Sequence, residues 1–143
     1  MKNVTFVVAA MLATSVTLAA DSFADLKTLQ GTWKVAAAEL SGRTLGGDFT
    51  GNTKLIIEGD RYVVMVGATP DKGTLKIDAG KSPKWMDING TEGPNKGKSI
   101  PAIYEISGDT LRICYDLGGT TRPTEFKTKP ETKLFLATYK RDK

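Results

Sequence analysis

The hydrophobic positions of this chain fall into short runs rich in Val, Ile, Thr and aromatic residues, which Gly, Pro, Asn and Asp separate. Runs of this length and composition predict β-strands. After Gln30 no stretch shows sustained helical periodicity. A short helical turn from Asp25 to Gln30 precedes them. The predicted strands are Thr32–Leu40, Lys54–Glu58, Arg61–Val66, Gly73–Asp78, Lys84–Asn89, Ala102–Ile106, Thr110–Asp116 and Lys133–Arg141.

Two of the connections between these runs contain the dipeptide Gly-Asp. Gly59-Asp60 separates the second run from the third, and Gly108-Asp109 separates the sixth from the seventh. A connection of two residues with glycine is typical of a tight hairpin. Both pairs of flanking strands are therefore expected to be antiparallel.

Eight short strands without helices to cover them leave the sheet edges as the main structural problem. Closing the sheet on itself removes the edges. We therefore expect an all-β fold, an eight-stranded antiparallel up-and-down barrel, with a two-sheet sandwich as the alternative. A barrel of eight strands is either filled by side chains or holds one small ligand.

Side chains of a strand alternate between the two faces of the sheet, so the pattern also predicts the barrel interior. If Trp33 faces inward, Ala37 and Glu39 do so too. In the strand Thr110–Asp116, alternation places Arg112 and Asp116 on the outer face. The inward-facing aromatic and apolar residues form either the wall of a ligand-binding cavity or an ordinary hydrophobic core. The residues expected to line the barrel are Val35, Tyr62, Tyr104, Tyr115, Phe135 and Tyr139.

The first residues of the chain differ in character from the rest. Lys2 supplies a positive charge, an apolar run extends from Val4 to Leu18, and small residues follow at Ala19-Ala20. This order predicts a secretory signal peptide over residues 1–20 and a single domain over 21–143, with Ala24 as a second candidate cleavage point. The protein is therefore expected to be exported to the periplasm, the cell envelope or the extracellular space.

The amino-acid composition limits which catalytic residues and metal ligands the chain can supply. The 143 residues include no His and one Cys, and the formal net charge is +4. Without His the commonest general base and metal ligand are missing, so we expect no catalytic residue, no metal and no cofactor. Cys114 cannot form an internal disulfide, and its role stays open. The lysines are spread along the chain, which does not favour a nucleic-acid partner.

A longer set of motifs resembles a known family. Gly31-Thr32-Trp33 resembles the G-x-W signature that opens the first strand of lipocalins. Over residues 25–141 the chain resembles small uncharacterised lipocalin-like domains known mainly from planctomycete bacteria. The resemblance implies that Trp33 pairs with Arg141 and closes one end of the barrel, and it implies no particular activity. Further matching segments are Asp25–Gln30, Ile57–Tyr62, Gly93–Lys98, Ile103–Glu105, Gly108–Cys114 and Arg122–Phe126.

The longest predicted connection, residues 117–132, carries Arg122, Glu125 and Phe126. Long ordered loops are often functional, so it is expected to be a lid over the barrel mouth or a contact surface. The alternative is an excursion packed against the barrel and anchored by Phe126.

Two functions follow from these features. The leading hypothesis is a binding protein that carries a small apolar or amphipathic ligand inside the barrel. The alternative is a filled barrel that acts through its surface, including Val63 and Met65, as an envelope interaction module or an enzyme inhibitor. An apolar cavity of a few hundred Å³ would favour the first hypothesis.

Overall fold

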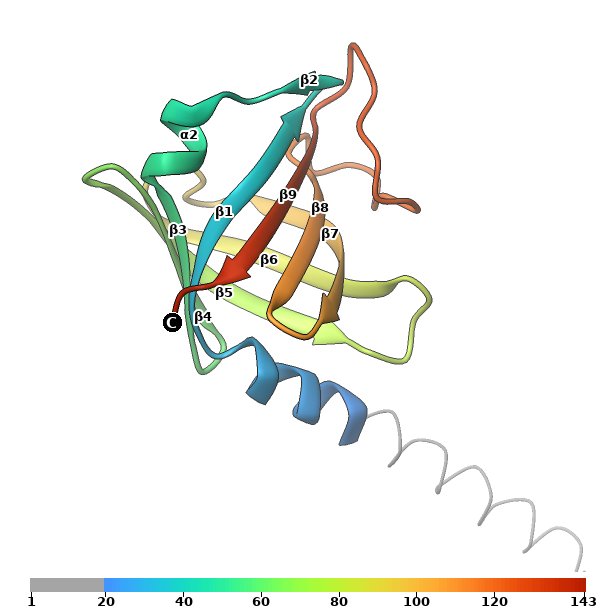
Figure 1. The fold of residues 1–143 in the computed structure, drawn as a ribbon. Helices are drawn as coiled ribbons and strands as arrows, with labels where there is room; N and C mark the ends of the chain where they lie inside the picture. Colours follow the sequence, from blue (N-terminus) through green and yellow to red (C-terminus); the bar gives the residue numbers. More distant parts are fainter. Residues whose placement is uncertain (1–19) are drawn as a thin grey trace, which may run out of the picture.

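The computed structural model describes residues 20–143, which fold into a closed antiparallel β-barrel (Figure 1). The large strands follow one another around the barrel in chain order, and the last pairs with the first. This confirms the predicted up-and-down barrel and excludes the sandwich. The elements are β1 (Gly31–Leu40), β2 (Arg43–Thr44), α2 (Gly47–Asn52), β3 (Thr53–Glu58), β4 (Arg61–Val66), β5 (Thr69–Asp78), β6 (Lys84–Glu92), β7 (Ser99–Ser107), β8 (Thr110–Asp116) and β9 (Leu134–Arg141).

Both Gly-Asp connections are tight hairpins. Glu58 pairs with Arg61, and Ser107 pairs with Thr110, so two residues span each turn. Gly59 and Gly108 have φ values of 64° and 58°. A positive φ at the first central position is typical of a type II′ turn, and glycine adopts it without steric cost.

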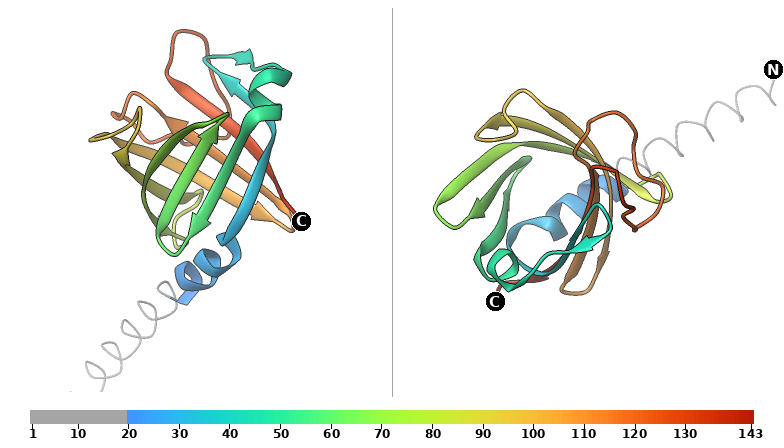
Figure 2. Two further views of the ribbon diagram at one scale, coloured as in Figure 1. Left: turned by 90° about the vertical axis from the view of Figure 1, so that its left-hand side faces the viewer. Right: turned by 90° about the horizontal axis from the view of Figure 1, so that it is seen from above.

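The seam between β1 and β9 closes the barrel. Trp33 lies opposite Arg141 at one end of the seam, and Leu40 lies opposite Phe135 at the other. Viewed from above, the strands surround a common axis (Figure 2). Closure gives β9 a partner on both sides, β8 and β1. On its other side, β1 pairs with β3 from Gly31 to Lys34 and with the short β2 at Glu39 and Leu40.

A β-bulge in β1 shifts the alternation that the sequence suggested. The register changes between Val35 and Ala37, and beyond this point Ala38 is buried whereas Ala37 is exposed. The prediction that Ala37 and Glu39 face inward was therefore wrong. A bulge inserts one extra residue into a strand, and every later side chain then changes face.

Helices lie at both ends of the barrel (Figure 1). Residues 20–29 are helical, so this helix is longer than the predicted turn. It lies at the end of the barrel where β1 begins, and α2 lies at the opposite end. The helix α2 was not predicted, because six residues with two glycines are too few to show a helical period. The predicted signal peptide lies outside the described residues except for its last position.

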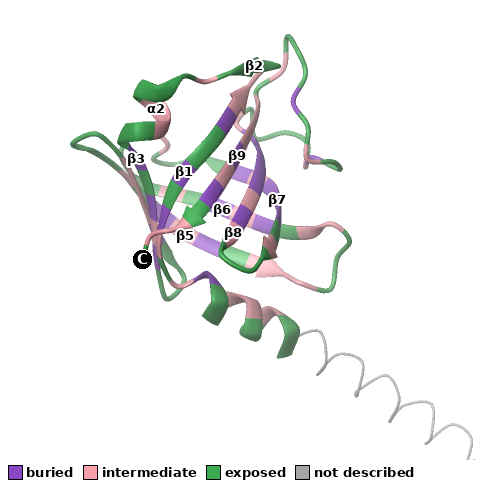
Figure 3. Ribbon diagram, in the orientation of Figure 1, coloured by how far each residue is buried: buried purple, intermediate pink, exposed green. Residues whose placement is uncertain are grey.

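The end of the barrel next to the N-terminal helix is filled. Leu29, Trp33 and Leu111 are fully buried there, and the Trp33 indole N–H donates to the carbonyl of Leu29 at 2.9 Å. The Arg141 guanidinium lies 4.2 Å from the Trp33 ring centre. Figure 3 shows that buried and exposed residues alternate along the strands that enclose this core. The predicted contact between Trp33 and Arg141 is therefore present.

Candidate functional site

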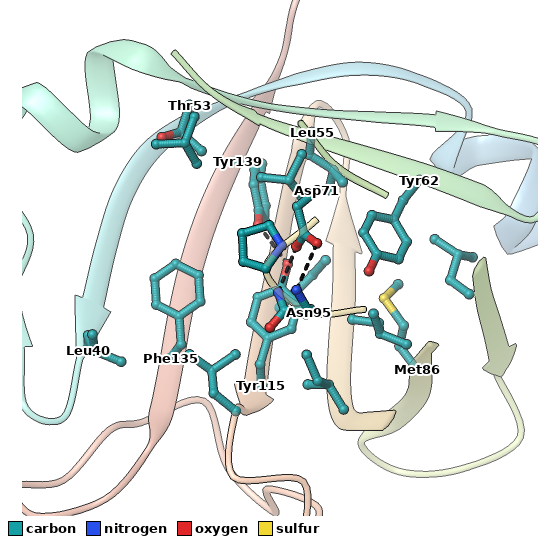
Figure 4. A pocket seen from close by; sticks show the side chains of 18 of the residues that line it. Leu40, Thr53, Leu55, Tyr62, Asp71, Met86, Asn95, Tyr115, Phe135 and Tyr139 are labelled. Carbon is teal, nitrogen blue, oxygen red and sulfur yellow. Dashed lines mark hydrogen bonds between the residues drawn. The ribbon is translucent and has the colours of Figure 1, made fainter. Parts of the chain in front are cut away.

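A cavity of about 530 Å³ occupies the other half of the barrel, towards α2 (Figure 4). Its wall consists mainly of apolar side chains that β3 to β9 direct inward. Val66, Thr69 and Pro94 line it and are exposed, so the cavity opens between the hairpin of β4 and β5 and the loop after β6. Apolar wall residues include Leu55, Val64, Leu75, Met86, Ile113 and Phe135.

Four of the six residues predicted to line the barrel contribute to this cavity. Val35 and Tyr104 are buried but do not line the cavity. The Tyr104 hydroxyl donates at 2.7 Å to Asp25 of the N-terminal helix. Alternation predicts the face on which a side chain lies but not its height along the barrel axis. The four that line the cavity are Tyr62, Tyr115, Phe135 and Tyr139.

Three of these aromatic residues form one cluster. The hydroxyls of Tyr115 and Tyr139 lie 2.6 Å apart, and the Phe135 ring stacks on that of Tyr115 with ring centres 5.4 Å apart. Burial raises the pKa of Tyr139 to about 12 and that of Tyr115 well above its ordinary value. Both phenols are therefore neutral at physiological pH. Phe49 of α2 meets Phe135 edge-on, which attaches α2 to this wall.

Two buried hydroxyls in the wall have no hydrogen-bond partner among the described residues: Thr53 Oγ1 and Tyr62 Oη. Both residues line the cavity, and they are 4% and 5% exposed. Gly73 lies opposite Tyr62, and a Cβ at that position would lie 2.7 Å from the phenol oxygen. The absence of a side chain at Gly73 thus lets the Tyr62 ring lie across β5. An unpaired buried hydroxyl costs about 1–3 kcal/mol, which a ligand group could offset.

One carboxylate, Asp71 of β5, also lines the cavity. The Asn95 side-chain amide donates to it at 2.7 Å, as Figure 4 shows. Asn95 belongs to the loop after β6, which crosses so close to Gly90 that a Cβ there would lie 1.9 Å from the Asn95 carbonyl oxygen. Asp71 is the only formally charged residue among the described residues that line the cavity.

Residues 117–132 run along the outer wall of the barrel. Arg122 donates to the carbonyls of Met86 and Ala102 at 3.3 and 2.9 Å and to the Asp87 carboxylate at 2.5 Å. Its guanidinium also lies 4.3 Å from the ring centre of Trp85. Arg122 therefore fastens the loop across the outside of β6 and β7.

Further contacts continue this attachment. Phe126 packs beneath the Arg112 guanidinium at 4.6 Å, and Thr128 donates to Glu39 at 2.7 Å. Glu125 is exposed. No described residue of 118–132 lines the cavity, so this loop is not a lid over it. The packed excursion anchored by Phe126 is the alternative that fits, and a contact role for the loop stays a prediction.

The loop also buries two side chains of β8. Cys114 lies beneath it with its thiol 3.7 Å from the Lys127 carbonyl oxygen, and burial raises the pKa of this thiol. An inaccessible, protonated thiol is unreactive. Asp116, expected to face solvent, is 7% exposed because the loop folds back over its carboxylate. Backbone N–H groups of Gly118, Thr120 and Thr121 donate to it.

Sequence reasoning missed several cavity residues. Val64 and Val66 follow Tyr62 by the alternation of β4, so counting along that strand would have found them. Asp71 and Asn95 lay in predicted loops, where no alternation applies. Phe49 lay on the unrecognised helix α2.

Comparisons with known proteins found no relative of this chain. No protein-family model matches the chain, and no curated protein matches it. Within residues 20–143, no helix has the length and apolar character needed to cross a bilayer. In the same part of the chain, no three His, Cys, Asp or Glu side chains are grouped to hold a metal ion. The fold and the cavity together define a β-barrel with an open, mostly apolar interior site.

Proposed function

We propose that this chain is an exported binding protein that carries a small amphipathic molecule in the open half of its barrel. The observation that carries the proposal is the apolar cavity of about 530 Å³, whose wall contains two buried hydroxyls without a protein partner. Cavities of roughly 300–1,000 Å³ with few polar groups are typical of small-molecule sites. Export rests on the signal-like sequence of the first twenty residues.

Affinity would come mainly from burying the ligand's apolar surface. Each buried methylene contributes about 0.8 kcal/mol, so the affinity should rise with the length of the ligand's hydrocarbon chain. The hydroxyls of Thr53 and Tyr62 would orient a polar group of the ligand. None of these steps needs covalent chemistry, which agrees with a binding role and with the absence of His from the chain. A barrel that acts through its surface alone has no need of this space.

Mass spectrometry of the purified protein tests the proposal. Protein prepared under native conditions is expected to release an apolar or amphipathic compound on denaturation. Emptied protein is expected to take up a hydrophobic fluorescent probe with one site per chain. Protein that is always empty and takes up no probe would contradict the proposal.

Two adjacent positions on β4 make the test specific. Val64 lines the cavity, whereas Val63 lies on the opposite face of the same strand. Val64→Phe is expected to fill part of the cavity and weaken probe binding at least about tenfold. Val63→Phe adds the same volume outside and is expected to bind the probe normally. Thermal unfolding of both variants shows that each is folded.

A further inference from the structure

We infer that the cavity selects a ligand with a cationic or hydrogen-bond-donating head, such as an alkylammonium, over one with an anionic head. This inference rests on the proposed function, because it assigns the chemical class of the ligand for the same cavity. It depends on where the single carboxylate lies and on what surrounds it.

Asp71 is the charged group of the wall, and nothing in the described chain neutralises it. No Lys or Arg nitrogen of the described residues forms an ion pair with it, and its side-chain partner is the neutral amide of Asn95. A carboxylate on an apolar wall is more stable beside an opposite charge. An ammonium group could supply that charge and a strong hydrogen bond.

Asp71 and Tyr62 lie on the same face of neighbouring strands. Tyr62 pairs with Gly73 and Val64 pairs with Asp71, so the carboxylate lies diagonally beside the phenol. Burial, and secondarily the Asp71 charge, raise the pKa of Tyr62 to about 12. The neutral phenol oxygen, which lacks a partner, can accept a hydrogen bond from a donor placed between the two residues.

The rest of the wall suits the remainder of such a ligand. Tyr115 and Phe135, which stack on each other, add aromatic surface to this wall. Leu55, Leu75 and Met86 offer apolar surface for a hydrocarbon tail. An anionic head would meet the Asp71 charge and find no Lys or Arg among the described lining residues.

Three probes with the same tail separate head-group preference from cavity binding: decylamine, decanol and decanoate. Each displaces a hydrophobic fluorescent probe from the purified protein. Decylamine is expected to bind about tenfold or more tightly than decanoate, with decanol between them. Equal affinities, or tighter binding of decanoate, would overturn the head-group inference and leave cavity binding intact. Failure of all three to bind would overturn both.

Two isosteric variants test whether Asp71 acts locally. Asp71→Asn is expected to reduce decylamine affinity to that of decanol and to leave decanol affinity unchanged. Asp48→Asn removes the same charge from exposed α2 near the mouth and is expected to leave the order of the probes unchanged. An equal loss in both variants would assign the preference to the general field and overturn a role for Asp71. Tyr62→Phe, expected to weaken decylamine binding severalfold, gives an independent readout.

Discussion

The guanidinium of Arg141 lies 4.2 Å from the centre of the Trp33 ring and donates at 2.9 Å to the carbonyl of Gln30. A second nitrogen of the same group donates to the carbonyl of Thr28. One side chain of the last strand thus contacts the first strand and satisfies carbonyls at the end of the N-terminal helix. These contacts join three elements and hold the filled end of the barrel closed.

Trp33 is expected to be the residue on which stability depends most. Trp33→Ala removes a fully buried indole and should lower the free energy of unfolding by about 3–5 kcal/mol. Trp85, which is 37% exposed, provides the control, and Trp85→Ala should cost about 1 kcal/mol or less. Denaturant unfolding measures both. A loss below about 1 kcal/mol for Trp33→Ala would refute its structural role.

The tyrosines should couple stability to alkaline pH. Burial raises the pKa of all of them from 10.0, to about 12 for Tyr62 and Tyr139, and it raises the pKa of Tyr104 and Tyr115 well above 10.0. Between pH 10 and 12 the unfolded chain releases protons that the folded barrel retains, so stability should fall as pH rises. Phenolate absorbance should therefore appear together with unfolding. Early ionisation of Tyr115 in folded protein would contradict this.

Asp116 should couple stability to acid pH with the opposite sign. Burial alone would raise the pKa of its carboxyl, but hydrogen bonds from Thr121, Gly118 and Thr120 outweigh it and hold the pKa below 3.8. Its contribution should be complete above that value and disappear as pH falls through the lower pKa of the folded state. Asp116→Asn should cost about 1–3 kcal/mol at pH 7. The difference from the original protein should shrink in acid; a constant difference would refute the coupling.

Glycine at position 73 should be required, and glycine at 51 should not. An added Cβ at Gly73 would lie 2.1 Å from the Asn89 carbonyl oxygen, whereas nothing lies within 4 Å of one at Gly51. Gly73→Ala should therefore lower the free energy of unfolding by more than about 1 kcal/mol and weaken probe binding through Tyr62. Gly51→Ala in α2 should raise it by about 0.4–1 kcal/mol. Thermal unfolding and probe titration of the pair check both effects, and equal behaviour would contradict the packing argument.

Cavity residues could be predicted from the sequence only within strands, where side chains alternate between the two faces of the sheet. Tyr115 lies in a strand whose alternation is regular, and Phe135 shares a face of the last strand with Tyr139 and Arg141, so the inward direction of both was readable from the sequence. Tyr104 has the same alternation in β7, yet it lies in the filled half and bonds to Asp25. Asp71 was not predicted to line the cavity, because β5 begins at Thr69, four residues before the start of the predicted strand at Gly73.

The sequence by itself determined the eight long strands and the two Gly-Asp hairpins, because these depend on local residue preferences. The pairing of Trp33 with Arg141 followed from the resemblance of Gly31-Thr32-Trp33 to a known signature. Tertiary structure decided which inward side chains fill the barrel and which surround space. That division depends on the bulge in β1, on the helices at the two ends, and on the loop that brings Asn95 to Asp71. Such features arise from packing between segments far apart in the chain, and no local pattern encodes them.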